Sequence, residues 1–128
     1  MTARSAVVDD FVAMVAALKF VDAFNPYSDM CADFDRPDAA AIRRGNLANA
    51  LEAALTTGVE SVWIARDLGY RGGRRTGLAL TDEAHLSAHS ALLGAGGLRR
   101  STLGPATAER TATVIWRMLV EIGKPIFL

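Results

Sequence analysis

The sequence has 128 residues, is 51% hydrophobic, and carries 14 basic and 14 acidic side chains, so its formal net charge is zero. This length fits one domain, residues 1–128, with enough chain to bury a substantial core. The composition excludes a disordered chain and a protein that binds polyanions over its whole surface. We therefore expect one globular domain in which any contact with nucleic acid is local.

Cys31 is the single cysteine, which excludes a disulfide within the chain and a zinc or iron–sulfur site held by several thiolates. No segment reaches the roughly 20 apolar residues that a membrane span requires. Asp9 and Asp10 precede the apolar run 11–18, so this run lacks the charge pattern of a signal peptide. We expect a cytoplasmic protein with no cofactor and no membrane contact.

Three elements and one loop are predicted in the first half of the chain. Apolar residues at helical spacing predict an amphipathic helix over about 5–20. Residues 22–38, rich in Asn, Asp, Pro and Ser, predict an ordered acidic loop. A second helix is expected over about 37–57, with a proline in its first turn. SVWIA, residues 61–65, has the β-branched and aromatic content of a buried parallel strand.

The second half of the chain continues this alternation. A weaker third helix is predicted over 82–93, a fourth helix over 108–123, and a second apolar strand in KPIFL, residues 124–128. Strands that alternate with helices are typical of an α/β domain, so we expect a Rossmann-like three-layer α/β/α fold with a mainly parallel sheet.

Two readable strands are fewer than such a sheet usually has. Further strands could be hidden in the loops, a homo-oligomer could complete the sheet through an unpaired edge, or the chain could be part of a longer one. We favour the last explanation, because the final strand has no loop at its carboxyl end, where α/β sites form.

The loop after residue 65 carries the most suggestive chemistry. Arg66 and Asp67 emerge where the first predicted strand ends, which is where α/β domains bind ligands. Glycines allow backbone N–H groups to face an anion, and the predicted phosphate-binding set is Arg71, Gly72, Gly73, Arg74 and Arg75. The spacing is neither that of a Walker loop nor that of a dinucleotide fingerprint. A solvated arginine-rich turn, with Asp67 as a turn cap, is the alternative interpretation.

The stretch IARDLGYRGGRRTGLALTDE, residues 64–83, resembles the first active-site motif of the uracil-DNA glycosylase superfamily. In that superfamily a hydrophobic strand delivers a small residue, a polar residue, an acid and a Gly/Pro-rich turn. GLALT, residues 77–81, lies where the superfamily has a Gly-Leu-x-Phe-Ser-like element. The chain is most similar to a bacterial branch, also through AFNPYSD at 23–29 and ERTATVIWRML at 109–119, so the resemblance covers most of its length.

The resemblance implies a DNA repair hydrolase that excises bases by hydrolysing the N-glycosidic bond without a metal, with DNA as its partner. Asp67 falls at the position whose carboxylate orients the attacking water and offsets positive charge on the sugar. Arg66 stands where relatives have Gln or Glu, Gly69 where some have a Tyr that excludes thymine, and Leu80 where an aromatic side chain stacks on the flipped base. These departures imply looser base recognition.

Three further residues complete the predicted substrate-binding set. Tyr70 would fill space beside Gly69, and Asn25 and Tyr27 would border the base pocket, although each also fits a packed or loop-anchoring role. The family continues after its PIFL-like strand into an Asn that reads the base and later into a His-Pro loop. Neither motif lies within these 128 residues, so we expect a weak glycosylase or none.

Two other interpretations stay open at this point. The chain could be a non-catalytic domain that binds phosphate or nucleic acid, or a structural or oligomerising fragment. His85 and His89 are four residues apart and could share a metal on a helix, but no carboxylate completes a ligand set there, and a satisfied helical pair is the preferred interpretation. We expect no metal.

Overall fold

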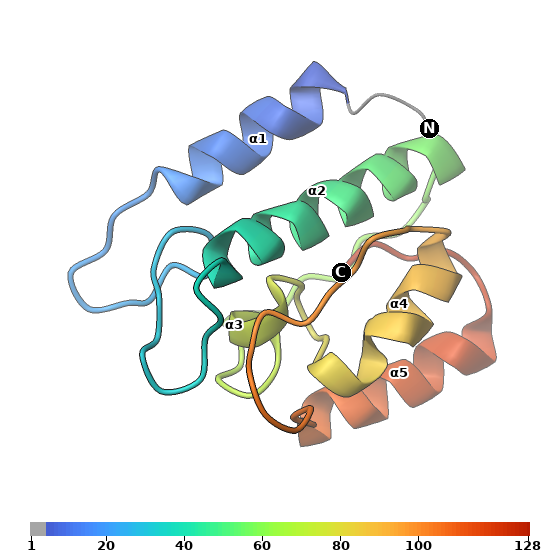
Figure 1. Cartoon of the computed structure of the whole chain (residues 1–128). Helices are drawn as coiled ribbons and strands as arrows, with labels where there is room; N and C mark the ends of the chain where they lie inside the picture. Colours follow the sequence, from blue (N-terminus) through green and yellow to red (C-terminus); the bar gives the residue numbers. More distant parts are fainter. Residues whose placement is uncertain (1–4) are drawn as a thin grey trace.

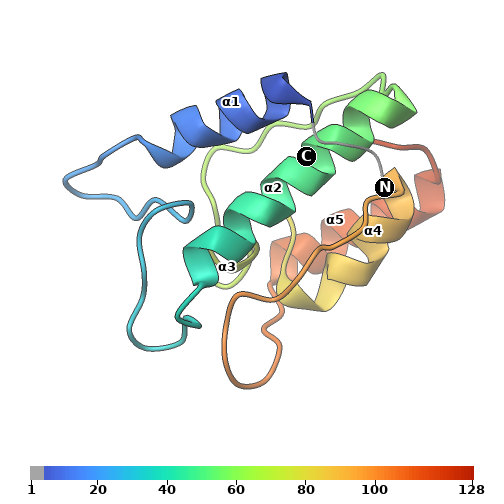
Figure 2. The ribbon, with the colours of Figure 1, turned by 45° about the horizontal axis from the view of Figure 1, so that its top comes forward.

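The structure is a computed structural model and describes residues 5–128. Its regular elements are helices: α1 (Ala6–Ala16), α2 (Ala39–Thr57), α3 (Gly73–Thr76), the 3₁₀ turn η1 (Glu83–His85), α4 (Leu86–Leu93) and α5 (Arg110–Ile122). The helix α1 packs against α2, α2 contacts α4, and α4 contacts α5 (Figure 1). Figure 1 shows the C-terminus between α2 and α4, and Figure 2 shows α1 on one side of α2 and α4 and α5 on the other.

The predicted Rossmann-like three-layer fold with a parallel sheet is wrong. Within residues 5–128 the pairing outside helices consists of two isolated bridges, antiparallel between Asp35 and Thr102 and parallel between Val62 and Phe127, and no sheet forms. The α/β interpretation depended on short β-branched runs, and such runs form a stable sheet only where several of them pair with one another along their length. Whether copies of the chain associate stays a prediction.

The two predicted strands do lie side by side and run in the same direction. Trp63 donates its N–H to the Phe127 carbonyl at 2.8 Å, and Phe127 donates to the Ser61 carbonyl at 3.1 Å. The pairing stops after this one bridge. The first segment is also not buried as expected, since Val62 is 58% and Ile64 is 90% exposed. Both segments are therefore extended chain rather than strands of a sheet.

Polar caps shorten or divide two of the predicted helices. The helix α1 ends at Ala16 rather than near residue 20, because the Asn25 amide donates to the carbonyls of Val15 and Leu18, both at 3.0 Å. The segment predicted as one helix over 82–93 is divided into η1 and α4, with Asp82 accepting from the His85 N–H at 3.0 Å. The predicted helices over 37–57 and 108–123 correspond closely to α2 and α5.

Three apolar clusters surround the paired segments. The first joins α1 to α2 and contains Val8, Val12, Tyr27, Leu47 and Ala48. The second lies around α2 and α4 and contains Ala50, Leu78, Leu86, Leu93 and Ala95. The third covers α5 and contains Ala112, Trp116, Leu119, Ile126 and Leu128. Phe127 packs on the first two and Trp63 on the third, so the extended pair connects the helical layers.

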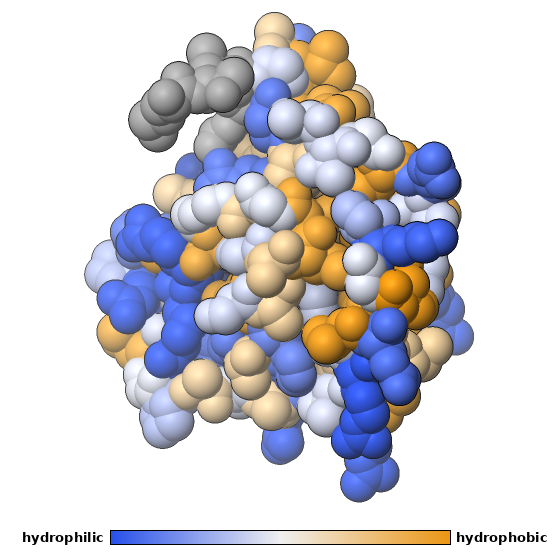
Figure 3. Space-filling model, turned by 90° about the vertical axis from the view of Figure 1, so that its right-hand side faces the viewer, coloured by the Kyte–Doolittle hydropathy of each residue, from blue (hydrophilic) through white to orange (hydrophobic). Residues whose placement is uncertain are grey.

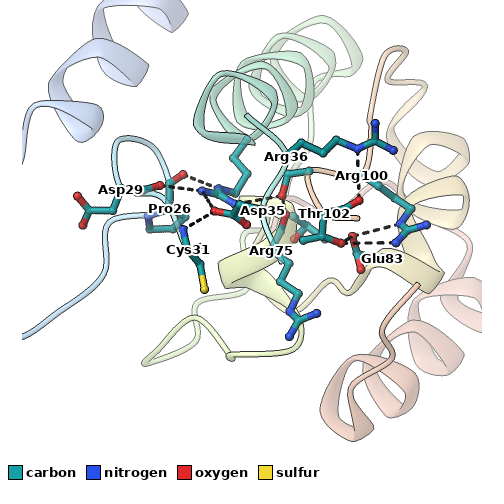
Figure 4. Close-up of polar contacts among 12 residues, drawn as sticks. Pro26, Asp29, Cys31, Asp35, Arg36, Arg75, Glu83, Arg100 and Thr102 are labelled. Atoms are coloured by element: carbon teal, nitrogen blue, oxygen red, sulfur yellow. Dashed lines mark hydrogen bonds and ion pairs between the residues drawn. The ribbon is translucent and has the colours of Figure 1, made fainter. Parts of the chain in front are cut away.

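A buried arginine fixes the long loop between α1 and α2 (Figure 4). Arg43 of α2 has no exposed surface and binds the Asp35 carboxylate through both terminal nitrogens, each at 3.0 Å. Its remaining donors reach the carbonyls of Pro26 and Asp29 and the hydroxyl of Ser101. A guanidinium has five N–H donors, and here all of them serve the fold. None is left for a DNA phosphate.

The surface keeps several large apolar side chains. On α5 these are Val114, Met118, Val120 and Ile122. Figure 3, which views the side of the molecule nearest α4 and α5, shows apolar residues in patches separated by charged ones. No helix within residues 5–128 is long and apolar enough to cross a membrane.

Candidate functional site

Asp67 lies in an exposed bend that follows the segment at Val62, which pairs with the C-terminal segment at Phe127. Its side chain is 74% exposed, and the neighbouring Arg66 side chain is 94% exposed. The Arg66 Nε donates to Asp67 Oδ2 at 2.9 Å. An ion pair this exposed contributes little to stability. The carboxylate is therefore open to water and to a ligand.

The structure also argues against Asp67 as a turn cap. A cap requires a backbone N–H that donates to the carboxylate. Among residues 5–128 the recorded partner of Asp67 is Arg66, and no backbone group donates to it. The loop around residue 67 therefore does not use this carboxylate to hold its shape.

Glu109 brings a second carboxylate to the glycine turn, and the sequence did not single it out. A Cβ atom added to Gly69 would overlap the Glu109 carboxylate, and one added to Gly72 would lie 3.2 Å from it. Glu109 precedes α5, and its N–H donates to Asp82 Oδ2 at 2.7 Å. The absence of side chains at residues 69 and 72 thus makes room for this acid.

Five side chains form what we call the arginine–aromatic cluster: Phe24, Phe34, Tyr70, Arg74 and Arg75. The Arg74 guanidinium carbon lies 4.1 Å from the centre of the Phe24 ring and 5.0 Å from that of Tyr70. The Arg75 guanidinium carbon lies 3.9 Å from the Phe34 ring centre and 5.1 Å from that of Tyr70. Cation–π contacts of this kind hold the basic loop against the acidic loop.

The predicted phosphate-binding residues differ in how far the fold already uses them. Arg75 donates to the Tyr70 carbonyl at 3.2 Å and to Thr107 Oγ1 at 3.1 Å. The Gly72 N–H donates to the Gly69 carbonyl at 3.1 Å, and Gly73 begins α3. Arg71 is exposed and Arg74 is half-buried, and within residues 5–128 neither has a recorded acceptor. Arg71 and Arg74 are thus the arginines of the set for which residues 5–128 supply no hydrogen-bond acceptor.

Leu80 adopts an unusual backbone conformation in the segment that resembles a base-stacking element. Its φ is 54°, and it is the one described non-glycine residue with positive φ. Its side chain packs on the α5 cluster, and its carbonyl accepts from Trp116 Nε1 at 3.1 Å. The structure places Leu80 as a half-buried core residue with a strained backbone, a combination that is often found near functional sites.

Asn25 and Tyr27 anchor the loop between α1 and α2. Besides its two bonds to the end of α1, Asn25 accepts from the Tyr27 N–H at 3.0 Å. The buried Tyr27 hydroxyl donates to the Gly77 carbonyl at 2.5 Å. Burial raises the pKa of Tyr27 to about 12, against the opposing charge of Arg43. These contacts favour the loop-anchoring role that the sequence left open.

The buried carboxylate of Glu83 accepts several hydrogen bonds close to the loop at residues 66–75. Glu83 is 5% exposed and accepts from Thr102 Oγ1, Thr107 Oγ1, the Thr107 N–H and Arg100 Nε. Burial alone would raise its pKa, but these hydrogen bonds outweigh burial and hold the pKa below its ordinary value. Thr107 Oγ1 also accepts a hydrogen bond from Arg75. The hydrogen bonds around Glu83 therefore hold one arginine of the basic loop in place.

The two histidines have separate environments. His85 Nδ1 lies 2.5 Å from the buried Asp82 carboxylate, whereas His89 Nδ1 lies 3.0 Å from Thr81 Oγ1. His89 is buried against Trp116, and burial lowers its pKa to about 4. In the part of the chain that the structure describes, no three His, Cys, Asp or Glu side chains gather as metal ligands.

A groove of about 480 Å³ lies between α1 and the start of α2. Tyr27, Ser28 and Arg44 contribute to its wall, together with residues of both helices. Tyr27 is the one predicted substrate-binding residue that lines it. The loop that carries Asp67 takes no part in this groove.

Comparisons with known proteins yield no relative for this chain. No family model matches it, and no curated protein or solved structure does so either. A function must therefore be argued from the geometry of the loop at residues 66–75 and from the sequence motif that it carries.

Proposed function

We propose that this chain excises damaged bases from DNA by hydrolysing the N-glycosidic bond, with Asp67 as the general base. The observation that carries the proposal is the exposed Asp67 carboxylate, which no backbone group uses. Asp67 follows the segment at Val62, which pairs in parallel with the C-terminal segment at Phe127. It occupies the position where the glycosylase-like motif has its catalytic acid.

The chemistry needs one carboxylate and one water. Asp67 accepts a proton from the water as the water oxygen forms a bond to C1′ of the sugar. The bond between C1′ and the base nitrogen breaks, and the base departs with the electron pair and takes a proton from solvent. Positive charge that develops on the sugar is offset by the carboxylate. Arg66, whose Nε donates to Asp67 Oδ2, places a positive charge beside that carboxylate.

The residues around Asp67 predict a slow reaction. Stacking on an aromatic side chain contributes about 1–3 kcal/mol per base, and Leu80 supplies no aromatic ring. Extrusion of a base from a duplex costs a few kcal/mol, and less for a mismatched or single-stranded base. Single-stranded and mismatched substrates should therefore react faster than fully paired DNA.

The test is base release under single-turnover conditions. Oligonucleotides with uracil, hypoxanthine or xanthine, single-stranded and in duplexes, are incubated with an excess of the wild-type chain, Asp67→Asn or Asp22→Asn. Asp22 is an exposed acid outside the site and serves as the matched control. We expect slow release by the wild type and Asp22→Asn, and a loss of about 10²-fold or more in Asp67→Asn. Folded wild-type protein that releases no base from any substrate contradicts the proposal.

A second candidate function is a non-catalytic domain that binds nucleic acid. The unused donors of Arg71 and Arg74 favour it. It predicts that Asp67→Asn binds DNA as tightly as the wild type, while neither protein releases a base. The same samples therefore separate the two functions.

A further inference from the structure

Arg74 holds a positive charge for which the fold supplies no partner. Its guanidinium carbon lies over the rings of both Phe24 and Tyr70, 4.1 and 5.0 Å from their centres, and its Nε is buried without a hydrogen bond. Within residues 5–128 no carboxylate lies within ion-pair distance of it. No hydrogen bond joins its terminal N–H groups to residues 5–128, so these groups keep their capacity to donate.

This arrangement prepares Arg74 for an anionic acceptor that can take two parallel hydrogen bonds. Two aromatic rings fix the orientation of the guanidinium, so little side-chain freedom is lost when a ligand binds. Phosphate oxygens match the spacing of the guanidinium nitrogens and form strong charge-assisted hydrogen bonds. A phosphate group is therefore the ligand chemistry that fits.

Arg71 lies on the same loop and adds a second unused cation. It is exposed and has no recorded acceptor within residues 5–128. The neighbouring arginines already have partners within the fold, since Arg66 binds Asp67 and Arg75 binds Tyr70 and Thr107. Glu109 is the acid at the glycine turn, and its single negative charge does not cancel the two unused arginines.

The site is within reach of the same DNA strand as Asp67. Four residues of extended chain span at most about 14 Å and seven at most about 25 Å, which bounds the distances from Asp67 to Arg71 and to Arg74. This is a few nucleotides along one strand. We propose that Arg74 and Arg71 bind a backbone phosphate of the DNA strand whose target nucleotide reaches Asp67, an inference that rests on the proposed function.

Fluorescence anisotropy with labelled oligonucleotides tests the inference without any chemical step. The probe carries a tetrahydrofuran abasic analogue, single-stranded or in a duplex, and binds the wild type, Arg74→Gln, Arg71→Gln or the control Arg117→Gln. Arg117 is an exposed arginine of α5. We expect each loop variant to bind about tenfold more weakly, with a salt slope smaller by about 0.7 on single strands and about 0.9 on duplex DNA. Arg117→Gln should bind as the wild type does.

If Arg74→Gln or Arg71→Gln binds DNA with the affinity and the salt slope of the wild type, the inference is wrong. Because Arg74 also packs on two rings, its variant is checked by thermal unfolding, and Arg71→Gln decides the outcome if Arg74→Gln does not fold. A second experiment measures the binding of inorganic phosphate to the wild type and to Arg74→Gln. If Arg74→Gln loses phosphate binding but keeps its affinity for DNA, the assignment to DNA is wrong. If the wild type releases no base although its DNA affinity depends on Arg74 and Arg71, the proposed role of Asp67 is wrong and the phosphate site stands. The two proposals therefore fail separately.

Discussion

His89 shows how a single buried residue links the fold to pH. Burial against Trp116 lowers its pKa to about 4, while the unfolded chain has a histidine pKa near 6.5. The unfolded state therefore binds more protons between these values, and this contribution to stability is complete above pH 6.5 and lost as the pH falls toward 4.

Urea unfolding across this pH range should show the effect. Between pH 7.5 and pH 4.5 the wild type should lose up to about 3 kcal/mol more than His89→Asn, which removes the titrating ring. Other groups titrate in both proteins, so the comparison is the difference between the two pH profiles. Parallel profiles would show that His89 does not carry this dependence.

Gly77 is a second single-residue determinant, at the boundary of the candidate site. Its φ is +74°, and a Cβ atom there would lie 2.8 Å from the Arg43 carbonyl oxygen. Gly94 offers a matched control, since its φ is +70° and its Cβ would meet nothing within 4 Å. Gly77→Ala should lower the free energy of unfolding by about 1–3 kcal/mol more than Gly94→Ala. Equal losses in thermal or urea unfolding would contradict this.

At the scale of elements, the loop between α1 and α2 depends on the buried pair of Arg43 and Asp35. Asp35→Asn removes the counter-charge and leaves the guanidinium buried without it, which should cost about 3–5 kcal/mol of unfolding free energy. The exposed Asp33 is the control, and Asp33→Asn should change stability by less than about 0.5 kcal/mol. A small effect of Asp35→Asn in urea unfolding would mean that the loop is held by its other contacts.

The elements also show which features a sequence can predict. The helices α2 and α5 follow from apolar periodicity that ends at a glycine, so both could be predicted closely. SVWIA looked like a strand because its composition reports only local preference, whereas a strand requires partners elsewhere in the chain. The extent of α1 was overestimated because its end is set by Asn25, a residue outside the helix.

The candidate site could be predicted only where its residues are neighbours in the sequence. The acid at residue 67 and the arginines of the loop are local in sequence, so the motif found them. The stacking of Arg74 on Phe24 joins residues 50 positions apart, and Glu109 reaches the turn at Gly69 from 40 positions away. No local pattern reports such contacts, so the sequence could not separate arginines that hold the fold from those with donors to spare.

At the scale of the whole molecule, α2 contacts α4 directly, one parallel bridge pairs the segments at Val62 and Phe127, and the loop at residues 66–75 follows the first of these segments. The acidic loop meets this basic loop through the arginine–aromatic cluster. The arrangement leaves Asp67 exposed to solvent, while Arg74 and Arg75 of the same loop contact aromatic rings. It is this combination of an open carboxylate and an ordered basic loop that supports a role on DNA.

Single-turnover base release by the wild-type chain and by Asp67→Asn is the most direct measurement of the central claim. The account predicts slow release that falls by about 10²-fold or more when the carboxylate becomes an amide, with Asp22→Asn unaffected. Equal rates for the wild type and Asp67→Asn, or no release by folded protein on any of the substrates, would contradict it.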